Sequence, residues 1–117
     1  MLTPDMIAYE DDFLLVLDKP AGMLVHPTVS ERGGTLYDYV KDYYERRSIT
    51  ADIHPVSRLD RNTSGLVIFA KEPIVQFWLS QQEVDKEYLA LAQGRLQQMQ
   101  GIIEAPIARK EGSIIER

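Results

Sequence analysis

Residues 65–70 read Gly65-Leu66-Val67-Ile68-Phe69-Ala70, six consecutive residues without a charged side chain. A short continuous apolar run of this length, bounded by turn residues, is typical of a buried strand. The stretch before it, residues 48–62, is polar and is interrupted by Pro55, so it does not suit a regular core element. We therefore predict a central strand at residues 65–70 that is entered from a polar loop.

Outward from this strand, the pattern indicates a second strand and a helix. The apolar run at residues 13–17 is stopped by Asp18-Lys19-Pro20-Ala21-Gly22, which predicts a buried strand followed by a turn. Thr35, with Asp38 three residues later, forms a capping-box pattern that opens a helix. The apolar face of this helix is expected to carry Leu36, Val40 and Tyr44.

The remaining elements complete a mixed fold. Pro73 suits the first turn of a second helix, which should run to about Val84 and cover the sheet. Alternating patterns predict further strands at residues 86–93, 101–104 and 113–115. We expect an α+β fold, with a mixed, mainly antiparallel sheet and flanking helices, in which residues 1–117 form part of a single domain.

Composition excludes several classes of function. The 117 residues include no cysteine, so a disulfide framework and thiolate chemistry are excluded. No run approaches the roughly 18 apolar residues that a membrane-spanning helix requires, and the N-terminus is acidic where a signal peptide would be basic. We therefore expect a cytoplasmic protein that is not associated with a membrane. The net charge of −5 argues against broad neutralisation of phosphates, although basic residues gather locally at Arg58, Arg61 and Lys71.

Two segments carry the chemistry. The first, residues 17–27, is Leu17-Asp18-Lys19-Pro20-Ala21-Gly22-Met23-Leu24-Val25-His26-Pro27. The second begins His54-Pro55-Val56-Ser57-Arg58-Leu59-Asp60-Arg61-Asn62-Thr63-Ser64 and runs into the strand at 65–70. The carboxylate of Asp60 lies between two arginines, and nearby positive charge favours its ionised form. An isolated Arg-Leu-Asp-Arg run is more often a solvated surface cluster than a site, so its context must decide.

In this order, the two segments resemble the first signature motifs of the RluA/RluD family of pseudouridine synthases, including the Arg-Leu-Asp core and the following Thr-Ser-Gly. A third match is Lys86-Glu87-Tyr88-Leu89-Ala90-Leu91, which is similar to the family's strand with an active-site tyrosine. The resemblance spans roughly residues 7–117. It identifies the chain as the N-terminal part of a single catalytic domain, without a separate RNA-binding domain.

The resemblance implies an isomerase that converts uridine to pseudouridine in RNA, ribosomal RNA first and transfer RNA second, without cofactor or metal. Asp60 is then the catalytic carboxylate, either as a nucleophile toward the sugar or as a base that removes a sugar proton. Tyr88 would lie against the target base, which must be flipped out of its stack. Arg58 would fill the space that the base vacates, and Arg61 is a further substrate-binding candidate.

The chain departs from the family pattern at two points. Ser57 stands where the family usually has histidine before Arg-Leu-Asp. The family's later motif, with a basic partner for the aspartate, would fall after Arg117. We therefore expect a truncated domain that is inactive alone and that associates with itself through unpaired strand edges.

Alternative interpretations remain open at this point. A non-catalytic RNA-binding or interaction fragment would keep the Asp60 segment without a complete pocket. A glycosidase-like hydrolase would pair Asp60 with a second carboxylate, Asp18 or Glu87. A metal site at His26 and His54 lacks recognisable ligand spacing. The tyrosines of the first helix are expected to pack in the core and on the surface rather than to form a platform for bases, namely Tyr37, Tyr39, Tyr43 and Tyr44.

Overall fold

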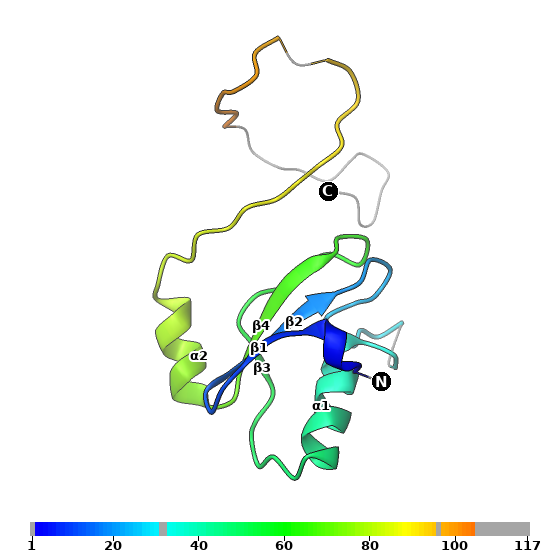
Figure 1. The fold of residues 1–117 in the computed structure, drawn as a ribbon, viewed down its shortest axis with the longest axis vertical. Helices are drawn as coiled ribbons and strands as arrows, with labels where there is room; N and C mark the ends of the chain where they lie inside the picture. Colours follow the sequence, from blue (N-terminus) through cyan, green and yellow to red (C-terminus); the bar gives the residue numbers. More distant parts are fainter. Residues whose placement is uncertain (1, 31–32, 96, 105–117) are drawn as a thin grey trace. The chain divides into compact units, whose positions relative to one another are not determined.

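The computed structural model describes residues 2–30, 33–95 and 97–104. Contacts divide the chain into two units, residues 1–85 and residues 86–117. The first unit contains all the helices and strands among the described residues (Figure 1). This unit combines an antiparallel sheet with two α-helices, which confirms the predicted α+β class.

The sheet has four strands in the order β1-β2-β4-β3, and every neighbouring pair is antiparallel. The bounds are Ile7–Glu10 for β1, Leu14–Lys19 for β2, His54–Pro55 for β3 and Gly65–Ala70 for β4. The pairing of β2 with β4 places Leu14 opposite Ala70 and Lys19 opposite Gly65. The strand predicted at 65–70 is therefore confirmed as a central strand, whereas β1, preceded by the 3-10 helix η1 (Pro4–Met6), was not predicted.

One face of the sheet forms the core. Side chains alternate along a strand, so Leu15 and Leu17 of β2 share this face with their β4 partners Phe69 and Val67. All four are fully buried. They pack in one cluster with the apolar face of the first helix, which comprises Leu36, Val40, Tyr43 and Tyr44. The opposite face is less covered, since Tyr9 and Leu66 are more than half exposed.

The helix that covers the core is α1, Leu36–Arg46. The predicted capping box is present: the Asp38 N–H donates to the Thr35 hydroxyl, and the Thr35 N–H donates to the Asp38 carboxylate. This arrangement satisfies two of the backbone donors that a helix N-terminus leaves without partners. The expected apolar face of the helix is likewise confirmed by the burial of Leu36, Val40 and Tyr44.

The second helix, α2, is shorter and less buried than predicted. It runs from Pro73 to Ser80, not to about Val84, and residues 81–85 after it are all exposed, so no packing stabilises a further turn. It contacts β3 and β4 at one edge of the sheet, where the Gln76 side chain donates to the Pro55 carbonyl at 3.3 Å. Phe77 and Trp78 remain exposed, so the expectation that this helix covers the sheet was wrong.

The strands predicted at residues 86–93 and 101–104 are absent from the structure. The described residues of the second unit contain neither helix nor strand, and Leu89 and Leu91 are fully exposed. An alternating pattern favours a strand, but a strand persists only where a partner accepts its hydrogen bonds. The strand predicted at residues 113–115 lies outside the described residues.

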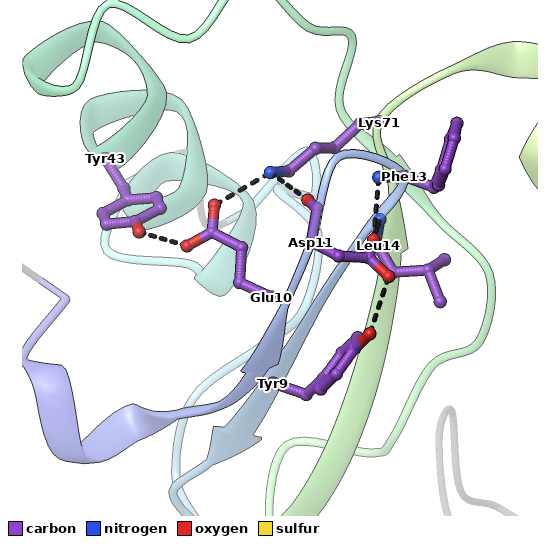
Figure 2. A network of polar contacts seen from close by, with 7 residues as sticks. All are labelled: Tyr9, Glu10, Asp11, Phe13, Leu14, Tyr43 and Lys71. Carbon is purple, nitrogen blue, oxygen red and sulfur yellow. Dashed lines mark hydrogen bonds and ion pairs between the residues drawn. The ribbon is translucent and has the colours of Figure 1, made fainter.

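A polar network ties β1, β4 and α1 together (Figure 2). Lys71, directly after β4, donates to the Glu10 carboxylate at 2.9 Å and to the Asp11 carbonyl at 2.6 Å. The Tyr43 hydroxyl donates to the other oxygen of Glu10. Partial burial would raise the pKa of Glu10, but the hydrogen bonds from Tyr43 and Lys71 outweigh it and hold that pKa below its usual value. The network therefore fixes the end of the sheet at which β2 begins.

Candidate active site

Residues 56–64, here called the Asp60 loop, connect β3 to β4. Its first residue is tied to the sheet, because the Val56 N–H donates to the Ile68 carbonyl at 2.8 Å. A turn follows the aspartate, with the Thr63 N–H donating to the Asp60 carbonyl at 3.0 Å. The side chain of Asp60 is exposed at this turn. The loop thus presents a carboxylate at the end of the central strand, as the sequence predicted.

Leu59 and Gly65 hold the loop close to the core. Leu59 is half-buried and packs against the core cluster, whereas its neighbours Arg58 and Asp60 are exposed. A Cβ added to Gly65 would lie 3.5 Å from the Leu59 side chain, and Gly65 has a φ of +140°. Residues with a side chain rarely adopt this backbone conformation, so glycine is required where the loop enters β4.

The main anchor of the loop is Lys19, which is fully buried at the end of β2. Its ammonium donates to the carbonyls of Pro20 at 2.9 Å, Met23 at 2.6 Å and Arg61 at 3.1 Å. The Arg61 carbonyl also accepts from the Gly22 N–H at 2.7 Å. One side chain therefore joins the Lys-Pro turn of the first signature segment to the residue that follows Asp60.

Charge couples Lys19 to Asp60. Burial lowers the pKa of the Lys19 ammonium, and the negative charge of Asp60 opposes this shift. The three carbonyls around the ammonium satisfy its donors, which is the condition for burying a charge without a large loss of stability. The Asp60 loop is thus held by a buried cation whose hydrogen-bond donors are all used.

Sequence reasoning did not include Lys19 among the site residues. The signal was present, because Lys19 follows Leu15 and Leu17 at a spacing of two and therefore belongs to the buried face of the strand. The predicted strand stopped at residue 17, whereas β2 continues to Lys19. A strand extended by two residues would have placed a lysine in the core and shown that it needs partners.

Among the residues predicted to bind substrate, Arg58 and Arg61 lie in the Asp60 loop and are exposed. They flank the aspartate in sequence, and Ser57, where the family usually has histidine, is half-buried before them. The structure brings these residues together with Asp60 on one short loop. Their assignment to RNA contacts stays a prediction.

Tyr88 belongs to the second unit and is 62% exposed in a segment without strand pairing. Its predicted role beside the base is not tested by this arrangement. Asp18, the partner required by the hydrolase hypothesis within the first unit, is exposed and lies on the sheet face opposite to Lys19. Within the described residues, no group of three His, Asp or Glu side chains is arranged to hold a metal ion.

The sequence matches a family model described as RNA pseudouridylate synthase over residues 13–116, a span that includes both signature segments and Asp60. The chain belongs to this family. The resemblance to RluA/RluD-type synthases is thereby confirmed. Across the described residues, no helix is long and apolar enough to cross a membrane.

Curated relatives within the family are similar over most of this chain. An uncharacterized RNA pseudouridine synthase of Bacillus subtilis, YjbO, is 36% identical over 95% of the chain and 41% of its own length. Ribosomal large subunit pseudouridine synthase D of Nitrosomonas europaea is 39% identical over 91% of the chain and 32% of its own length. The chain therefore spans 41% and 32% of the length of these two relatives.

A solved structure supports the fold. Human RNA pseudouridylate synthase domain containing 4 superposes with a TM-score of 0.52 and 23% sequence identity. The match covers 64% of this chain and 28% of the human chain. The α+β arrangement around β2 and β4 is thus that of part of a pseudouridine synthase domain.

Proposed function

We propose that this chain carries the catalytic-aspartate part of an RNA pseudouridine synthase that isomerises uridine to pseudouridine in ribosomal RNA. The observation that carries the proposal is the exposed Asp60 carboxylate on a loop anchored by the buried Lys19. The similar protein from Nitrosomonas europaea is named for the large ribosomal subunit, which favours ribosomal RNA. A yeast relative is named tRNA pseudouridine(32) synthase, so transfer RNA is the second substrate class.

The reaction breaks the N-glycosidic bond, turns the uracil and rejoins it to the sugar through carbon. Asp60 would be the essential carboxylate, and the reaction would need neither cofactor nor metal. Arg58 would occupy the space left by the flipped uridine, since a planar guanidinium stacks on bases and binds phosphate. Arg61 would contact the same RNA strand, and Tyr88 would lie against the target base.

We further infer that residues 1–117 belong to one catalytic domain and include no separate RNA-binding domain. We also propose that the protein acts on RNA in the cytoplasm. Self-association is proposed because β1 is an edge strand whose outer side has no partner strand among the described residues. The exposed Tyr9 and Leu66 on the uncovered sheet face would add apolar area to that contact.

The test is release of tritium from ribosomal and transfer RNA that contains 5-tritiated uridine. The 117-residue chain and any longer natural protein that contains it are compared as wild type, Asp60→Asn and the matched control Asp12→Asn. Asp12 is an exposed aspartate at the far end of the sheet. We expect release that disappears in Asp60→Asn and is unchanged in Asp12→Asn. Equal release by wild type and Asp60→Asn contradicts the proposal.

The second candidate is a non-catalytic RNA-binding fragment. This candidate is favoured because the chain spans only 41% and 32% of two of its relatives, so much of a complete domain has no counterpart in the chain. The two candidates differ in one observable. A folded protein, shown by cooperative unfolding, that binds RNA but releases no tritium would favour the binding fragment over the isomerase.

A further inference from the structure

Two stacked aromatic rings, one on the first signature segment and one on α1, have no role in the proposed chemistry. The imidazole of His26 and the ring of Tyr37 stack, with centroids 5.4 Å apart and planes 27° from parallel. Both residues are half-buried, and neither belongs to the hydrophobic core or to the residues packed against it. Tyr43 and Tyr44 are in that core, as predicted, so Tyr37 differs from these other tyrosines of α1.

The backbone ties this pair to the segment that carries the anchor of the Asp60 loop. The Leu36 and Tyr37 N–H groups of α1 donate to the carbonyls of Leu24 and Val25, both at 2.8 Å. The carbonyl of Met23, which precedes Leu24, accepts a hydrogen bond from the Lys19 ammonium, as does the Arg61 carbonyl. Three residues of chain span at most about 11 Å, so His26 lies within that reach of the anchor that holds the Asp60 loop.

The polar atoms of the pair also lack internal partners. Within the described part of the chain, neither the His26 ring nor the Tyr37 hydroxyl forms a hydrogen bond to another residue. A buried tyrosine or histidine in a core normally finds such a partner. Partly exposed stacked rings with available polar edges suit a nucleobase, which offers both an aromatic face and hydrogen-bonding groups.

The charge of the chain supports the same interpretation. With 13 Lys and Arg against 18 Asp and Glu, the chain has no excess of positive charge with which to gain affinity by release of counterions. Stacking of bases on aromatic side chains supplies affinity that does not depend on phosphate contacts. An acidic RNA-binding protein therefore has a particular need for aromatic contacts near its active site.

We propose that the His26–Tyr37 stack binds an unpaired base of the substrate RNA next to the target uridine. This inference rests on the proposed function and names a specific contact for it. The stack gives the RNA a sequence-tolerant hold on the first signature segment and α1 rather than on the Asp60 loop itself.

The experiment measures binding of fluorescein-labelled decauridylate to the 117-residue chain by anisotropy at two salt concentrations. Variants are Tyr37→Ala, Tyr37→Phe, His26→Ala and the control Phe77→Ala, which removes an exposed aromatic ring from α2. We expect Kd to rise about tenfold in Tyr37→Ala and His26→Ala. Tyr37→Phe, which keeps the ring, and Phe77→Ala should stay within about twofold of wild type.

The salt dependence separates stacking from phosphate contact. Tyr37→Ala should keep the wild-type slope of log Kd against log salt, whereas Arg58→Gln should reduce it. The proposal is overturned if the wild type does not bind decauridylate or if Tyr37→Ala binds as the wild type does. Tritium release that requires Asp60, together with unchanged binding by Tyr37→Ala, refutes the stack and leaves the isomerase standing. Weakened binding by Tyr37→Ala without release in any preparation supports the stack and refutes the isomerase.

Discussion

Replacement of Lys19 by methionine tests whether the buried ammonium stabilises the Asp60 loop. Methionine fills a similar volume but donates no hydrogen bond. The Arg61 carbonyl would keep its bond from the Gly22 N–H, and Pro20 is exposed, so its carbonyl can turn to water. The Met23 carbonyl, in a half-buried residue, would lose the shortest of the three contacts.

The size of the effect follows from these partners. Hydrogen bonds to a charged group contribute about 1.5–3 kcal/mol each, and the cost of burying the ammonium offsets part of the sum. We expect Lys19→Met to lower the free energy of unfolding by about 2 kcal/mol, which for a domain of this size lowers Tm by roughly 10 °C. That loss is a large fraction of the roughly 5–15 kcal/mol by which a native domain is stable.

The assay is urea unfolding followed by far-ultraviolet circular dichroism, with Lys41→Met as the matched control. Lys41 is an exposed residue of α1, so its replacement should change stability by less than about 0.5 kcal/mol. Hydrogen exchange gives a local readout, because the Gly22 amide should lose protection when the anchor is removed. An unfolding midpoint for Lys19→Met equal to that of wild type would refute the reasoning, since the ammonium would then cost as much as its hydrogen bonds contribute.

Three further predictions concern stability. The pKa of Glu10 is lower in the folded state than in the unfolded state, so its ionised carboxylate stabilises the fold above pH 4.5 and this stabilisation is lost as the pH falls. At neutral pH we expect Glu10→Gln to be about 2 kcal/mol less stable than the wild type. When the free energy of unfolding is measured at decreasing pH, this difference should shrink. Burial raises the pKa of Tyr44 from 10.0 to about 12, so its hydroxyl ionises in the unfolded state before it ionises in the folded state. Stability should therefore fall as the pH rises from 10 toward 12. Thermal melts of Tyr44→Phe should not show this loss. Gly65→Ala should cost more than about 1 kcal/mol in urea unfolding because of its φ of +140°, and an unchanged midpoint would contradict that strain.

The elements that the sequence predicted correctly are those with strong local signals. The apolar run at residues 65–70 and the Thr35 capping box each specify an element without help from distant residues. Strand β1 was missed because its four residues carry no clear alternation and its pairing with β2 is interrupted between Ile7 and Tyr9. The partner strand, rather than its own pattern, makes this segment a strand.

The wrong predictions have the same origin in reverse. Residues 86–93 alternate well enough for a strand, yet no partner strand pairs with them in the part of the chain that the structure describes. The second helix ends at Ser80 because no packing surface extends it. Local pattern therefore proposes these elements, and long-range contacts decide whether they form.

The candidate site was predicted in part. Asp60, Arg58 and Arg61 were found through a sequence motif, and the structure places them on one loop. Lys19 was missed because a lysine is normally exposed, although its spacing of two from Leu15 and Leu17 placed it on the buried face of the strand. The three carbonyls that bind its ammonium could be identified only from the coordinates, and the roles of the exposed residues in the motif stay predictions.

The anchor of the Asp60 loop has a consequence for how much sequence change the loop can accept. Lys19 and Gly22 bind the main-chain carbonyl of Arg61. Substitutions at residues 58 and 62 can therefore alter the exposed surface of the loop while these two main-chain contacts are kept. A laboratory library randomised at these two positions should retain folded variants at high frequency. If the proposed function holds, the loop is then a practical starting point for changing which RNA sequence the protein accepts.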